Sequence, residues 1–143
     1  MQLHTISAYQ TSAEDFFNEL QNWHVDLVLD IRLHNTTQLD GFTKEKDLAY
    51  FVHKIDHATY VHDVEFAPKA QDLYDYLHHK MSWEGYSAAY ERDLRERHAI
   101  EDFFKKYGTY KSVALVGTAT KKRRSHSEIL ADMITQAMQS HAA

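Results

Sequence analysis

Cysteine is absent from this chain of 143 residues. Disulfides, zinc–thiolate sites and thiol catalysis are therefore excluded. Proline occurs once and glycine four times, while hydrophobic residues make up 43% of the sequence, a composition unlike that of disordered or linker-rich proteins. A chain of this length buries about two-thirds of its unfolded surface around one core. We therefore expect a single globular domain over residues 1–143.

Long apolar runs and an excess of basic residues are also missing. No segment has the length and apolar character of a membrane span, and the first residues lack the basic-then-apolar layout of a signal peptide, so we predict a cytoplasmic protein without membrane association. The formal net charge of −5 argues against duplex nucleic acid as a partner. His53 and His57 have metal-ligand spacing but lack the accompanying Glu of a metalloprotease helix, and we predict no metal site.

Hydrophobic periodicity predicts strands alternating with helices. Strands are expected at residues 2–8, 25–31, 58–64 and 113–116, and helices at 12–23, 44–55, 68–80, 82–107 with a break near His98, and from Ser125 onward. This order indicates an α/β fold: one three-layer domain with a small, mostly parallel sheet of about four strands flanked by helices. If the first strand is central, right-handed crossovers favour the strand order 3-2-1-4.

Four consecutive cations, Lys121 to Arg124, stand just before the last helix. Ser125 and Glu128 have the spacing of a capping box, in which each side chain satisfies an amide of the first helical turn. A helix N-terminus carries about half a positive charge and unpaired N–H groups, so cations beside it favour an anion pocket. The alternative is a run of solvated surface cations.

The predicted second strand ends in an acid and a base, Asp30 and Arg32. Ligands of open parallel sheets bind outside the carboxyl ends of the strands, where these residues are expected to lie. Asp30 would contact a ligand hydroxyl or act as a base, whereas the alternative is that Asp30 and Arg32 only pair with each other. The strand order also predicts that residues 7–11 face residues 117–126 across the crevice.

The candidate site residues follow from these features. The catalytic candidates are Asp30 and His126. The predicted ligand-binding residues are Ser7, Arg32, Thr118, Lys121, Arg123, Arg124, Ser125 and His126.

Three segments together resemble an uncharacterised family, domain of unknown function 488, over roughly residues 3–133. They are Thr5–Ile6–Ser7–Ala8–Tyr9, Leu27–Val28–Leu29–Asp30–Ile31–Arg32, where the family has a strand ending Asp-Val-Arg, and residues 114–131. In the last segment the family usually reads Cys-any-Glu, a spacer and Cys-His-Arg. This chain reads Gly117–Thr118–Ala119 and Ser125–His126–Ser127 there, keeping only His126 of the five motif residues, while Arg124 matches a position that the family often fills with Arg.

The resemblance implies an α/β fold with a cleft at the strand ends, but the family's reaction, ligands and cofactors are not established. Three functions stay open. The chain binds a small phosphate- or carboxylate-bearing ligand in the cleft, it is a nucleic-acid or protein interaction module that uses the basic loop 121–124, or it is a degenerate enzyme that has lost the family's cysteines. None of these patterns sets a cofactor or the oligomeric state.

Overall fold

The computed structural model describes the backbone of residues 1–142 and the side chains of residues 1–140. Its strands are β1 (Gln2–Ser7), β2 (Leu27–Asp30), β3 (Thr59–His62) and β4 (Ser112–Gly117). Its α-helices are α1 (Ala13–Asn22), α2 (Glu45–Asp56), α3 (Ala70–Leu77), α4 (Trp83–Glu96), α5 (Ala99–Tyr107) and α6 (His126–Ala142), with short 3-10 helices η1 (Gln38–Thr43) and η2 (Val64–Phe66).

Local sequence signals account for several of these boundaries. The Ser12 hydroxyl accepts the Asp15 N–H at 3.0 Å and begins α1, and Ser82 accepts the Gly85 N–H at 3.0 Å in the first turn of α4. His98 has a left-handed backbone (φ 54°) between α4 and α5. The expected break in the long helical stretch is therefore confirmed.

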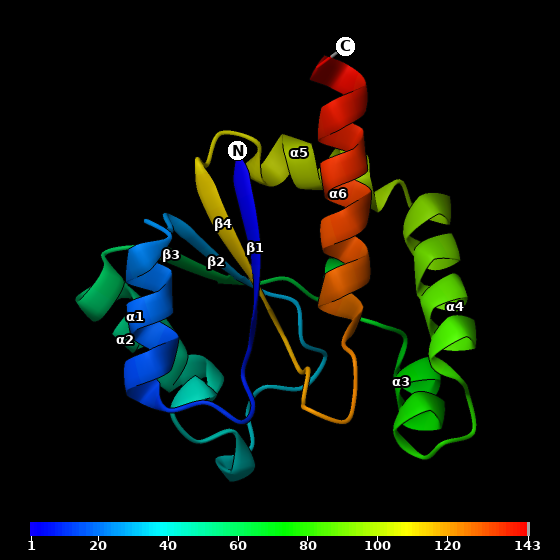
Figure 1. Ribbon diagram of the computed structural model, residues 1–143, viewed down its shortest axis with the longest axis horizontal. Coiled ribbons are helices and arrows are strands. Elements are labelled where there is room, and N and C mark those ends of the chain that lie inside the picture. Colours follow the sequence, from blue (N-terminus) through cyan, green and yellow to red (C-terminus); the bar gives the residue numbers. More distant parts are fainter. Residues whose placement is uncertain (143) are drawn as a thin grey trace.

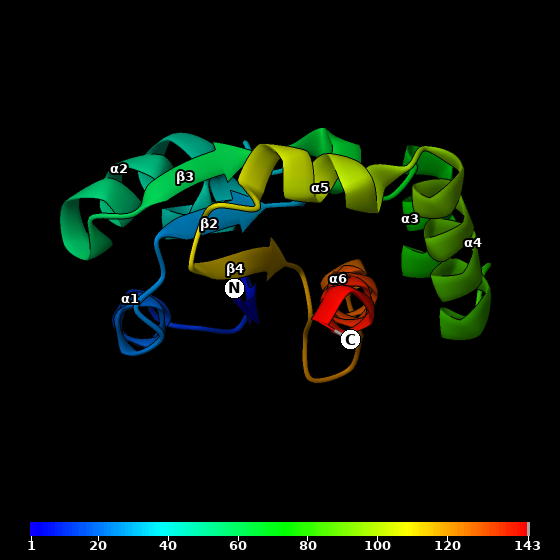
Figure 2. The same cartoon turned by 90° about the horizontal axis from the view of Figure 1, so that it is seen from above.

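Helices cover both faces of the sheet, as the α/β prediction requires (Figures 1 and 2). One face buries Val28, Ala114 and Val116 against α1 and α2. The other face buries Leu27, Leu29, Ile31, Val113 and Leu115 against residues of α4, α5 and α6. Alternation of side chains along each strand supplies both layers.

The four strands are all parallel, and their order is β1-β4-β2-β3. The predicted order 3-2-1-4 is therefore wrong, because β4 enters between β1 and β2 instead of lying outside β1. Right-handed crossovers permit both orders, so burial decides between them. Every residue of β4 is buried, whereas β1 carries Gln2 and Thr5 exposed to solvent and lies at the edge.

The central place of β4 sets the geometry beyond its carboxyl end. Ser7 pairs in register with Gly117, and the Ala8 N–H donates to the Gly117 carbonyl at 3.0 Å. From β2 the chain continues to α2 on one face, and from β4 it continues to α6 on the other. The loops after these two neighbouring strands therefore diverge, which is where a ligand crevice forms in open α/β sheets.

No helix within residues 1–142 is both long enough and apolar enough to cross a membrane. The cytoplasmic location stays a prediction.

Candidate functional site

Asp30 and Arg32 form a buried ion pair at the carboxyl end of β2. The Arg32 Nε donates to Asp30 Oδ1 at 2.9 Å, and its Nη2 donates to Oδ2 at 2.7 Å. Asp30 is 0% and Arg32 1% exposed. The two side chains thus pair with each other, the alternative that the sequence had left open.

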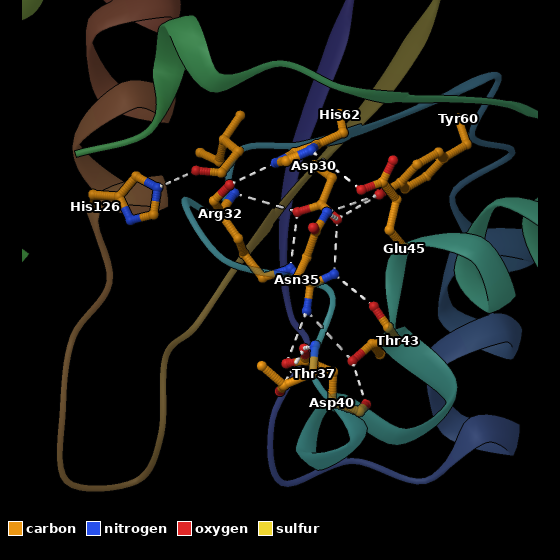
Figure 3. A network of polar contacts seen from close by, with 11 residues as sticks. Asp30, Arg32, Asn35, Thr37, Asp40, Thr43, Glu45, Tyr60, His62 and His126 are labelled. Carbon is orange, nitrogen blue, oxygen red and sulfur yellow. Dashed lines mark hydrogen bonds and ion pairs between the residues drawn. The ribbon is translucent and has the colours of Figure 1, made fainter. Parts of the chain in front are cut away.

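A ring of neutral groups completes the hydrogen bonding of this pair (Figure 3). The Tyr60 hydroxyl and the Asn35 amide donate to Asp30 Oδ2 at 2.6 and 3.1 Å. The Arg32 Nη2 also donates to the Thr43 carbonyl at 2.6 Å. Few of the hydrogen-bonding positions on either charged group are left for a ligand.

Burial alone would raise the pKa of Asp30, but the Arg32 guanidinium and the Tyr60 and Asn35 donors outweigh it and lower that pKa. Asp30 is therefore an ionised structural partner at neutral pH. Its carboxylate faces the polar ring, and the catalytic role assigned to it stays a prediction.

His126 occupies the first position of α6 and is 2% exposed. Burial lowers its pKa to about 4, although a hydrogen bond to the Ile31 carbonyl and the charge of Asp30 act in the opposite direction. The imidazole is therefore neutral at pH 7, and Nε2 donates to the Ile31 carbonyl at 2.7 Å. Nδ1 is then an acceptor, 3.4 Å from the Ser125 hydroxyl.

Ser125 is buried between the end of β4 and the first turn of α6. Its Oγ accepts the Thr118 N–H at 3.1 Å and the Ser127 N–H at 3.4 Å. The helix begins next to Ser125, as predicted, but the cap differs from a capping box, because the Glu128 carboxylate pairs with Arg124. The hydroxyl is thus committed to internal contacts.

A cavity of about 160 Å³ lies beyond the carboxyl ends of β2 and β4. We call it the strand-end cavity. Its polar lining consists of Tyr9, Arg32, His34, Thr118, Arg123 and His126, and its apolar lining of Leu33, Pro68, Leu73 and Leu77. Four of the predicted site residues, from two separate loops, are therefore brought together.

The four cations of the loop do not converge. Only Arg123 lines the strand-end cavity. Lys121 and Lys122 are exposed, and Arg124 lies 4.5 Å from the Trp83 ring centroid while it pairs with Glu128. The predicted pocket of four basic side chains around the helix start is therefore not formed.

Ser7 lies outside the cavity as well. Its hydroxyl donates to the Ala119 carbonyl at 2.5 Å, and the Lys121 N–H donates to Gln10 Oε1 at 2.8 Å. Residues 7–11 and 117–126 are thus adjacent, as expected, but they bind each other. The ligand-binding roles predicted for Ser7, Lys121, Arg124 and Ser125 stay predictions.

Helix α3 supplies a wall of the cavity that the sequence did not identify. Leu73 and Leu77 lie at helical spacing in the helix expected at residues 68–80. No residue of α3 is fully buried, and both leucines line the cavity.

Comparison with family models identifies one match. Residues 12–134 match the family described as Domain of unknown function DUF488. The chain belongs to this family. Its missing cysteines make it a divergent member of the DUF488 family in the respect noted from the sequence. No curated protein and no solved structure was found to match the chain.

The two positions at which the DUF488 pattern places cysteines lie in contact here. A Cβ added to Gly117 would lie 2.6 Å from the Ser125 hydroxyl oxygen. Gly117 and Ser125 are therefore neighbours in space although eight residues apart in sequence. In this chain that space is filled by the hydroxyls of Ser125 and Ser127.

Proposed function

We propose that this chain binds a small anionic ligand in the strand-end cavity. The proposal rests on the position and the free hydrogen-bonding groups of the Arg123 side chain. Within the side chains described, residues 1–140, its guanidinium has no ion pair and no hydrogen bond, and it lines the cavity. Arg32, in contrast, is paired with Asp30. Arg123 is therefore the cation that a ligand acid group would meet.

The apolar wall limits the rest of the ligand. Leu33, Leu73 and Leu77 line the same cavity as Arg123, and these leucines are only half-buried without a ligand. A volume of about 160 Å³ accepts an apolar group of roughly the size of benzene. The ligand thus combines one carboxylate or phosphate with a short apolar body.

Calorimetric titration with small carboxylates and phosphate esters tests this proposal. Arg123→Gln should weaken binding about ten- to a hundredfold, because a partly buried charged hydrogen bond is lost. Lys121→Gln is the matched control, since Lys121 belongs to the same loop but does not line the cavity. Equal affinity of Arg123→Gln and the unaltered chain, or no binding of any anion, would contradict the proposal.

The exposed half of the loop supports a second candidate. Lys121 and Lys122 are exposed and adjacent, and they are available to a nucleic acid or protein partner. A salt-sensitive gel shift with single-stranded RNA that is lost in Lys121→Gln/Lys122→Gln would favour this interaction module. The same shift retained in the double variant would count against it.

The contact between Gly117 and Ser125 supports the degenerate-enzyme candidate. Cysteines at both positions would be close enough to act on one group, as a family dithiol would. Gly117→Cys/Ser125→Cys should then lose both free thiols together under mild oxidation. Two thiols that react independently would remove this candidate.

A further inference from the structure

A second hollow lies on the other side of Arg123. It is a surface depression of about 370 Å³ between the turn that joins α3 to α4 and the basic loop. We call it the basic depression. Arg123 lines both the basic depression and the strand-end cavity. A ligand group held by Arg123 therefore adjoins two spaces, one small with an apolar wall and one larger.

The basic depression is a local exception on an acidic protein. Lys80, Lys122 and Arg123 line it together with His79, and none of its lining residues is Asp or Glu. The chain as a whole has a net charge of −5. A carboxylate carries one charge, whereas a phosphate monoester carries nearly two at pH 7 and offers three acceptor oxygens. The surplus of cations therefore matches a phosphate better than a carboxylate.

The two basic segments are fixed relative to each other. The Tyr76 hydroxyl of α3 donates to the Arg124 carbonyl at 3.0 Å. Within the loop, the Thr120 N–H donates to the Arg123 carbonyl at 2.9 Å in a short antiparallel bridge. These contacts hold the backbone that carries Arg123 beside the α3–α4 turn that carries Lys80.

We infer that the ligand of the strand-end cavity is a phosphate ester, with its short apolar group in the cavity and its phosphate between Arg123, Lys80 and Lys122. The inference rests on the proposed function and selects phosphate over carboxylate. Trp83 and Tyr76 form the aromatic wall of the basic depression, so Trp83 is an internal reporter of the phosphate subsite.

Benzyl phosphate and phenylacetate are matched probes, because they share a benzyl group of a size that suits the cavity. Calorimetry at low salt should give about five- to tenfold tighter binding of benzyl phosphate, since each exposed lysine contributes modestly. Added salt should reduce this advantage. Lys80→Gln/Lys122→Gln should abolish the advantage and leave the affinity for phenylacetate unchanged, while Lys121→Gln should change neither.

Trp23→Phe leaves Trp83 as the sole tryptophan and permits a second readout. Benzyl phosphate should change the emission of Trp83, whereas phenylacetate should not. Phenylacetate binding as tightly as benzyl phosphate, with both dependent on Arg123, would overturn the inference and leave the proposed function standing. Inorganic phosphate binding as tightly as benzyl phosphate would overturn the link to the cavity. No binding of either benzyl compound would overturn both proposals.

Discussion

Gly117 ends the central strand directly against two hydroxyl side chains. A Cβ at this position would lie 2.6 Å from Ser125 Oγ and 2.8 Å from the Cβ of Ser127. Both neighbours are buried at the start of α6. Glycine is thus required here by close approach, since its φ does not lie in the left-handed region.

Gly117→Ala should lower the free energy of unfolding by about 2 kcal/mol, because the added methyl group overpacks the junction between β4 and α6. Gly85→Ala is the control. Its Cβ would lie 3.3 Å from the Ser82 hydroxyl oxygen that caps the exposed first turn of α4, so the higher helix propensity of alanine is offset by a tight contact, and we expect a change of less than about 0.5 kcal/mol. Urea denaturation of both variants measures the difference, and a neutral Gly117→Ala would contradict the crowding.

At the scale of the element, the segment from Ile31 to Thr43 is held by side chains. His126 Nε2 donates a hydrogen bond to the Ile31 carbonyl at 2.7 Å. His62 Nε2 donates one to the Arg32 carbonyl, also at 2.7 Å. The Arg32 guanidinium ties its far end at Thr43. Residues 31–43 are therefore anchored at both ends.

Arg32→Met should cost about 3–5 kcal/mol, because it leaves the Asp30 carboxylate buried without its cation. Tyr60→Phe, which removes one hydroxyl donor, should cost about 1 kcal/mol and keep the fold. Limited proteolysis should cut residues 34–43 faster in Tyr60→Phe than in the unaltered chain. Lys44→Met is the control, since its 3.9 Å pair with Asp47 lies at the surface, where Lys44 is half-buried and outside the polar ring. Equal cleavage of Tyr60→Phe, Lys44→Met and the unaltered chain would show that the polar ring does not hold the segment.

The helices and strands were predictable because each is determined by local sequence signals. The run from Val113 to Val116, the serines that begin α1 and α4, and the break at His98 all appear in the sequence. The position of β4 in the strand order depends on which strand it pairs with after the crossover from β3. The handedness of the crossover does not determine that choice. Likewise, Arg123 and Arg124 are neighbours in sequence, but a tertiary contact with Trp83 and an i,i+4 ion pair with Glu128 turn Arg124 away from the cavity.

For the whole molecule, two titratable groups act on stability in opposite directions. The pKa of His126 is lowered to about 4 by burial, so the unfolded chain takes up its proton first as pH falls from 6.5, and folding is destabilised. The pKa of Asp56 at the end of α2 is raised to about 6 by burial. The folded chain then binds that proton first, so Asp56 costs stability at pH 7 and this cost disappears below pH 3.8.

Asp56→Asn should therefore raise the free energy of unfolding by about 1 kcal/mol at pH 7, because Asp56 is half-buried and lies at a helix C-terminus. It should also steepen the loss of stability between pH 6.5 and 4. In the unaltered chain, protonation of Asp56 partly offsets the destabilisation caused by His126, and the variant lacks this offset. Denaturation midpoints across this range measure both effects. An unchanged pH profile would show that Asp56 titrates normally.

The late position of β4 in the sequence bears on synthesis. β1 precedes the other strands in the chain, yet its hydrogen-bonding partner in the sheet is residues 112–117. Until residues 112–117 have been translated, β1 has no neighbour in the sheet and β2 lacks one of its two. We therefore expect nascent chains that stall before that point to carry unpaired strand edges and to bind chaperones more readily than the folded protein.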